Sequence, residues 1–102
     1  MSRRFQPTPA YRIFLDLLVK ERTDRGVTQE ELATRLALSP AQIAAFELGH
    51  KQIDFVQTRE WCQALGVTFL DFMIQLDREI TAQLLDTNAP DADAEQTEGG
   101  TK

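Results

Sequence analysis

The chain has 102 residues, of which 42% are apolar and 26% are charged, so there is room for one small domain and a tail. Its single cysteine, Cys62, excludes an intramolecular disulfide and favours a reducing compartment. The net charge is −5, but residues 86–102 carry five acids and one lysine, which leaves residues 1–85 at −1 and excludes a strongly basic domain.

Residues 1–9 are predicted to form a flexible N-terminal arm, because Pro7 and Pro9 favour extended backbone before them. Arg3 and Arg4 could reach DNA phosphates or a minor groove, and the alternative is a frayed terminus. The arm does not lead into an apolar run, and charges interrupt the apolar stretches that follow. The sequence therefore predicts no signal peptide, no membrane partner and a cytoplasmic location.

Residues 10–85 are predicted to form one domain that begins with a helix over residues 10–23. Phe14, Leu15 and Leu18 give this segment a broad apolar face at helical spacing. Lys20 and Arg22 place positive charge near its end, which suits the helix dipole. The segment is therefore predicted to pack on the helices that follow it.

Residues 27–49 have the pattern of two short helices joined by a tight turn. Thr28 is a hydroxyl N-cap and Glu31 completes a capping box, which starts a helix over residues 29–36. Ser39 caps a second helix, residues 40–48, with Pro40 at its first position. Ile43, Phe46 and Ala44 or Leu48 supply its inward face, and Gly49 ends it. Helices this short need flanking helices for stability, and the pattern indicates a helix-turn-helix.

Two further helices are predicted, over residues 55–65 and 69–85, with Asp54 and Thr68 as their N-caps. The residues expected to complete the core are Phe55 or Val56, Trp61, Cys62, Leu65, Phe69, Leu70, Phe72 and Met73. Residues 86–102 contain no large apolar side chain and are predicted to be a disordered acidic tail.

The last helix carries an apolar stripe that continues beyond the predicted core. Its spacing is close to that of a coiled-coil seam, which predicts a homodimer through Met73, Leu76, Ile80 and Leu84. The alternative is that this stripe folds back onto its own domain. The last helix and the tail are also the predicted sites for a protein partner.

Residues 11–73 resemble the Cro/phage-repressor-like (xenobiotic-response-element type) helix-turn-helix family. The matching residues are Gly26-Val27-Thr28-Gln29, Glu31-Leu32-Ala33, Leu36, Ile43, Glu47 and Gly49, Ile53-Asp54, and Ala64-Leu65-Gly66-Val67. The resemblance implies an all-α, five-helix domain, here with an extended last helix, that binds double-stranded operator DNA as a dimer and regulates transcription. It also implies that Arg22 either lies near the DNA backbone or pairs with Glu47.

The resemblance implies that the helix over residues 39–48 enters the major groove, with Gln29 and Lys51 on phosphates. The implied DNA contacts are Gln29, Ser39, Pro40, Ala41, Gln42, Ala44, Ala45, His50 and Lys51. Gln42 is the one good base reader, because an amide can pair with N6 and N7 of adenine, and the alanines offer methyl contacts to thymine. So few polar readers imply low specificity, readout of DNA shape, or another kind of partner.

The sequence therefore predicts a DNA-binding repressor that acts as a dimer. The alternative is a helix-turn-helix domain used mainly for protein–protein interaction, such as an antitoxin or a phage-encoded modulator. With one histidine, one cysteine and no Gly-rich phosphate loop, the chain offers no catalytic constellation, no metal site and no cofactor site. It is not expected to be an enzyme.

Overall fold

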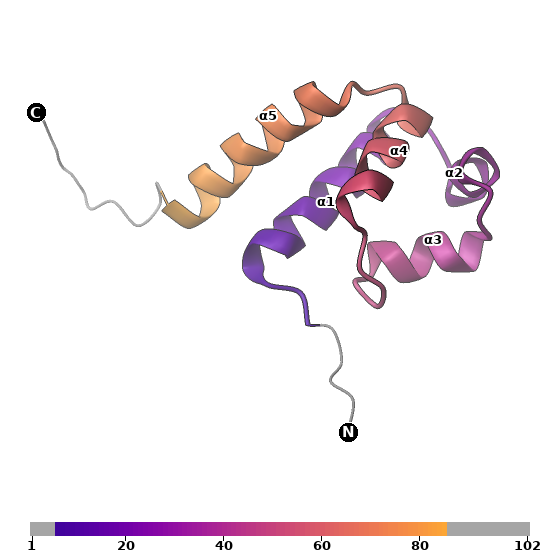
Figure 1. The fold of residues 1–102 in the computed structure, drawn as a ribbon, viewed down its shortest axis with the longest axis horizontal. Helices are drawn as coiled ribbons and strands as arrows, with labels where there is room; N and C mark the ends of the chain where they lie inside the picture. Colours follow the sequence, from indigo (N-terminus) through magenta and orange to yellow (C-terminus); the bar gives the residue numbers. More distant parts are fainter. Residues whose placement is uncertain (1–5, 86–102) are drawn as a thin grey trace, which may run out of the picture.

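A computed structural model describes residues 6–85, which form five α-helices (Figure 1). The helices are α1 (Pro9–Asp24), α2 (Gln29–Leu36), α3 (Pro40–Glu47), α4 (Phe55–Leu65) and α5 (Phe69–Ile80), and a short π-helix, η1 (Thr81–Leu85), continues α5. The all-α, five-helix prediction is confirmed. Arg3, Arg4 and the acidic residues 86–102 lie outside the described residues.

A polar side chain starts each of the five α-helices. Thr8, Thr28, Ser39, Asp54 and Thr68 each accept a hydrogen bond from the backbone N–H three residues further on. The first helix thus begins at residue 9, one residue earlier than predicted, because proline needs no hydrogen-bond acceptor at the first helical position. The other predicted starts agree with the structure.

The core lies where α1 meets the helices around it. Its largest fully buried side chains are Leu15, Leu18, Leu32, Ile43, Trp61, Cys62 and Phe72. The rings of Phe46 and Trp61 meet edge to face with centroids 5.3 Å apart, which joins α3 to α4. Trp61 and Cys62 are 2% and 1% exposed, so their predicted burial is confirmed.

Three residues predicted for the core lie on the surface instead. Phe55, Val56 and Leu70 are 68%, 63% and 69% exposed, whereas Thr58 is buried. The inward face of α4 begins at Thr58, whose hydroxyl donates to the carbonyl of Asp54 and so is satisfied without water. The first turn of α4 lies outside this face, and the Phe55 ring packs against Phe69 at 5.1 Å between centroids.

The apolar stripe of the last helix lies at least partly against the core of its own domain. Leu76 is only 9% exposed, and Met73, Ile80 and Leu84 are partly buried against the same core. The reason is that α1 has 16 residues and α5 packs along it (Figure 1). The stripe therefore packs at least in part against its own domain, as the alternative has it, and a dimer through these four residues stays a prediction.

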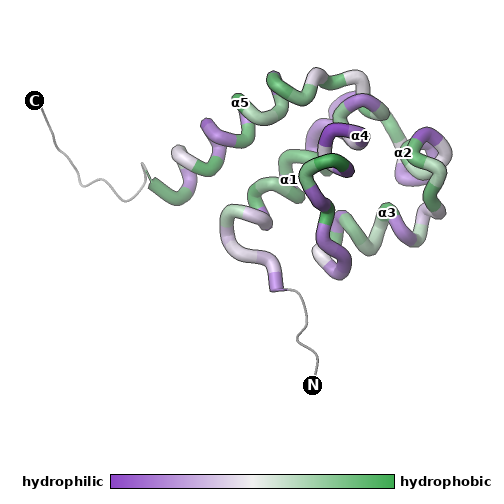
Figure 2. Tube along the Cα trace, in the orientation of Figure 1, coloured by the Kyte–Doolittle hydropathy of each residue, from purple (hydrophilic) through white to green (hydrophobic). Residues whose placement is uncertain are grey.

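The colours in Figure 2 show apolar and polar segments alternating along α5, as expected for a helix with one side toward the core. No helix in the described range is both long and apolar enough to cross a membrane.

Candidate nucleic-acid interface

The tight turn between α2 and α3 fixes the angle at which α3 leaves the domain. Ala37 adopts a left-handed conformation with φ of 58°, and the N–H of Leu38 donates to the carbonyl of Ala33 at 2.9 Å. The side chain of Leu38 packs against the core. The chain therefore changes direction within three residues, and α3 lies next to α2 at one end of the molecule (Figure 1).

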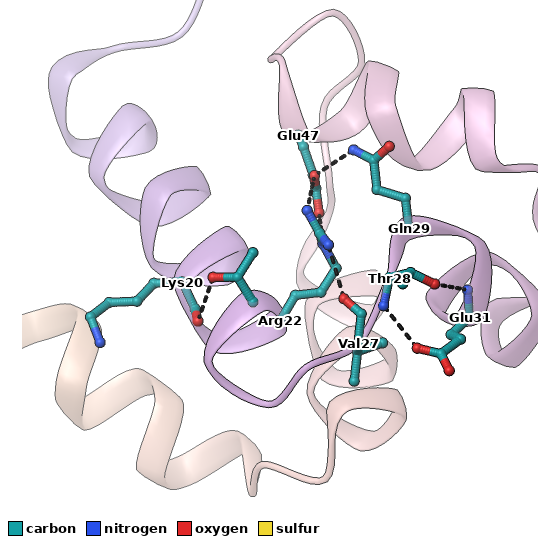
Figure 3. Close-up of polar contacts among 8 residues, drawn as sticks. Lys20, Arg22, Val27, Thr28, Gln29, Glu31 and Glu47 are labelled. Carbon is teal, nitrogen blue, oxygen red and sulfur yellow. Dashed lines mark hydrogen bonds and ion pairs between the residues drawn. The ribbon is translucent and has the colours of Figure 1, made fainter.

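A buried ion pair holds the C-terminal end of α3 against α1. The Arg22 Nε donates to Glu47 Oε2 at 2.6 Å, and Nη2 donates to Oε1 at 3.0 Å. The remaining Nη1 donates to the carbonyl of Val27 at 2.9 Å, so the guanidinium lies between the carboxylate and the backbone (Figure 3). The predicted pairing of Arg22 with Glu47 is confirmed, and its bidentate geometry is the strong form of this interaction.

Gln29 joins this pair, a contact that the sequence did not predict. Its Nε2 donates to Glu47 Oε1 at 2.9 Å (Figure 3). The side chain is thus committed at least in part to positioning α3. At this helix start the backbone N–H groups of Gln29 and Glu30 have no acceptor among the described residues.

These N–H groups face an open recess between the starts of α2 and α3. The residues that line it are Arg22, Thr28, Gln29, Glu30 and Pro40. The N-terminal end of a helix attracts an anion, but the exposed carboxylate of Glu30 opposes one at the same place.

The outward face of α3 carries small apolar side chains. Ile43 and Phe46 point into the core, while Pro40 and Ala41 are exposed and Ala44 and Ala45 are half-buried. The predicted groove-facing residues therefore do gather on one helix. Leu48, which the sequence analysis offered as an inward residue, is 61% exposed and caps the end of this helix instead.

Gln42 is engaged in a capping box that the sequence analysis did not recognise. Its backbone N–H donates to Ser39 Oγ at 3.1 Å, and its Oε1 accepts from the backbone N–H of Ser39 at 2.8 Å. The signal was present, because a serine three residues before a glutamine is the capping-box spacing. The oxygen required to pair with N6 of adenine therefore already accepts one hydrogen bond within the protein.

Two basic side chains lie at the C-terminal end of α3. Lys51 Nζ sits 5.4 Å from the centroid of the Phe46 ring, and Arg12 Nη2 donates to the carbonyl of Leu48 at 3.4 Å. Arg12 was not predicted, because only the tertiary fold brings the first turns of α1 to this place. His50 is exposed in the same loop.

Other basic residues are not part of this cluster. Arg35 turns to α4, where its Nη1 donates to the carbonyl of Ala64 at 3.0 Å. Within the part of the chain that the structure describes, no group of three or more histidine, cysteine, aspartate or glutamate side chains could hold a metal ion.

A family model described as Helix-turn-helix matches residues 18–72, more than half of the chain. Among solved structures, an XRE-family like protein from Pseudomonas syringae pv. tomato str. DC3000 is 28% identical with a TM-score of 0.65, over 68% of this chain and 84% of that one. The clp gene regulator ClgR from C. glutamicum is 27% identical with a TM-score of 0.64, over 79% of this chain and 100% of that one.

A variant of the restriction-modification controller protein C.Esp1396I is 26% identical with a TM-score of 0.62, over 68% of this chain and 91% of that one. No curated protein sequence matches the chain.

Proposed function

Since this chain belongs to the Cro/C1-type helix-turn-helix family and is a DNA-binding transcription regulator, we propose that it is a repressor that binds operator DNA as a dimer. The observation that carries the proposal is the geometry of α3. The buried pair of Arg22 and Glu47 fixes this helix from one side, and its opposite side carries only small or apolar side chains. Small side chains let a helix backbone approach base edges closely.

In the proposed complex, α3 lies in the major groove with its N-terminal end toward the bases. The contacts to the groove come from Ser39, Pro40, Ala41, Gln42, Ala44 and Ala45. The N-terminal end of α2 at Gln29 binds one phosphate, and Lys51, with His50 and Arg12 beside it, binds another. These contacts flank α3 and set its register on the duplex.

The proposed dimer uses an apolar patch other than the stripe predicted from sequence. Leu70 and Ile74 lie one turn apart on α5 and are 69% and 43% exposed, and the exposed Phe55 packs on Phe69, the residue before Leu70. We call these four residues the α4–α5 patch. A two-fold axis at this patch is proposed to place two α3 helices about 34–36 Å apart, one turn of the duplex.

A protein-binding helix-turn-helix is the second candidate, and the apolar outward face of α3 favours it. Exposed apolar surface of this kind is also typical of protein interfaces. The two functions differ in their dependence on salt, because only a DNA complex releases condensed counterions.

The deciding experiment is a salt titration of the full chain on duplexes taken from a random-sequence selection. We expect log affinity to fall linearly with log salt and Lys51→Ala to make that slope shallower by about 1 per protomer, or about 2 for the proposed dimer. Arg78→Ala is the matched control, because Arg78 is an equally exposed base on α5, and it should leave the slope unchanged. Binding no tighter than ~10⁻⁵ M at physiological salt on every sequence would refute the DNA function.

A further inference from the structure

The side chains of α3 and its caps have no unused hydrogen-bond acceptor except lone pairs on oxygens that already accept. Ser39 Oγ accepts from the N–H of Gln42, and Gln42 Oε1 accepts from the N–H of Ser39. Both carboxylate oxygens of Glu47 accept from Arg22, and one also accepts from Gln29. Each of these side-chain acceptors therefore already accepts at least one hydrogen bond within the protein.

The capping box also fixes which way round the Gln42 amide lies. The group that it meets is the backbone N–H of Ser39, which is a donor, so the contacting atom must be the oxygen. The NH₂ of the amide then points away from the cap, at the end of α3 that leads into the groove. What Gln42 offers to a base edge is therefore a pair of donors.

The rest of the outward face consists of carbon. Ala41, Ala44, Ala45 and Leu48 follow one another at helical spacing, and Leu48 is 61% exposed. Such a stripe gains free energy when it covers apolar groups, and the apolar group in the major groove is the C5-methyl of thymine.

We infer that α3 reads the keto bases: guanine, through its acceptors N7 and O6, and thymine, through its methyl group and O4. For the amino groups on the major-groove edges of adenine and cytosine, which need an acceptor, the side chains of α3 have only the second lone pairs of oxygens that already accept from the protein. This inference rests on the proposed function and specifies the base chemistry of that same surface. It replaces the adenine pairing that the sequence alone suggested for Gln42.

The first test compares the base preferences of the full chain with those of Gln42→Glu by selection from random duplexes. Glutamate preserves the cap, as Glu31 does for Thr28 in α2, but presents an acceptor where glutamine presents donors. We expect guanine at one position of each half-site to be replaced by cytosine, with a preference change of at least about tenfold. Gln52→Glu adds the same charge in an exposed loop outside α3 and should leave the preferences unchanged.

The second test substitutes single bases in the selected duplex. Deoxyuridine, which lacks the methyl group, should weaken binding about three- to fourfold at the thymines under α3 and not in the flanks. The loss should shrink in Leu48→Ala. 7-Deazaguanine should weaken binding at the Gln42 position, whereas a purine without the 6-amino group should be tolerated in place of adenine throughout the α3 site.

The outcomes separate this inference from the proposed function. Selection of adenine at the Gln42 position, or a loss on removing the adenine amino group, would overturn the keto-base inference while leaving a DNA-binding regulator. The same holds if specific binding is indifferent to every base analogue, because readout is then by shape. Absence of specific binding on any duplex would instead refute the proposed function.

Discussion

At the scale of single residues, Arg22 holds α3, the helix proposed to contact DNA, through its pair with Glu47. Its side chain is 11% exposed and that of Glu47 is 9% exposed, so neither charge can rely on water. Removing one partner of such a pair leaves the other buried and uncompensated, which costs more than the pair itself contributes.

We predict that Glu47→Ala lowers the free energy of unfolding by about 3–5 kcal/mol in a urea titration. Glu60→Ala, which removes an exposed helical carboxylate, should change it by less than about 0.5 kcal/mol. The double variant Arg22→Met, Glu47→Leu should recover most of the loss. A cost below about 1 kcal/mol for Glu47→Ala would mean that the pair is not buried in solution.

Cys62 links stability to pH. Burial in the core, with a smaller contribution from Glu21, raises the pKa of its thiol from 9.0 to about 11. Because the folded state holds the proton more tightly than the unfolded state, this stabilisation is complete below pH 9 and is lost as the pH rises toward 11.

The expected result is a fall in the free energy of unfolding above pH 9, of at most about 2–3 kcal/mol from this group. Cys62→Ala should remove that part of the pH dependence, although it is less stable at neutral pH because it leaves a small cavity. Identical pH profiles for the two proteins would contradict the assignment. The measurement is denaturant unfolding at a series of pH values.

Residue-level predictability depended on whether the partner was local. The capping boxes of Thr28 and Ser39 involve residues three apart, so sequence spacing contains the information, although the second was overlooked. The contacts of Gln29 and Arg12 join residues 18 and 36 positions apart, and no local pattern encodes them. The Arg22–Glu47 contact was predicted only because the family resemblance supplied it.

At the scale of elements, the helix boundaries were largely predictable because each start carries its own cap. Which face of each helix is buried was less predictable. Thr58 has the polarity of a surface residue but is buried, since its hydroxyl is satisfied by its own helix, and Phe55 is apolar but exposed. Periodicity cannot rank two candidate faces when the neighbouring helix decides which of them is covered.

The turn between α2 and α3 contains a residue in a conformation that its side chain disfavours. Ala37 has φ of 58°, which costs about 1–2 kcal/mol for a residue with a Cβ. We predict that Ala37→Gly raises the free energy of unfolding by about 0.5–1 kcal/mol, after the greater freedom of glycine in the unfolded chain is subtracted.

Thermal unfolding would measure this effect as a rise in Tm. The control is Ala64→Gly in the last turns of α4, where the same change removes a good helix former and should lower the stability by up to about 1 kcal/mol. A decrease in both variants would show that the turn is not strained.

At the scale of the whole molecule, the sequence does not show which apolar surface is left exposed to bind a second copy of the chain. Hydrophobic spacing along the last helix marked Met73, Leu76, Ile80 and Leu84, but Leu76 is buried and the other three pack partly against the core of the same chain. The sequence pattern shows that an apolar stripe must be buried, but it does not show which surface covers the stripe. The α4–α5 patch became visible only after the fold had assigned that stripe to the core.

We predict that Leu70→Glu converts a dimer into a monomer in sedimentation experiments and weakens binding to a two-half-site duplex by at least about tenfold. Leu85→Glu is the control, because Leu85 is 63% exposed on η1, outside the patch. If the wild-type chain is monomeric at micromolar concentration, or if both variants dissociate equally, the α4–α5 patch is not the dimer interface.

The two faces of α3 have different roles, and this matters for changing the DNA sequence that the helix is proposed to bind. Its anchoring residues, Ile43, Phe46 and Glu47, face the domain, and its exposed residues contribute no contact to the core. The exposed Pro40 and Ala41 can therefore be exchanged for longer side chains with little effect on the core. Substitutions at these positions, made one at a time, are therefore a way to change which operator sequence the chain prefers.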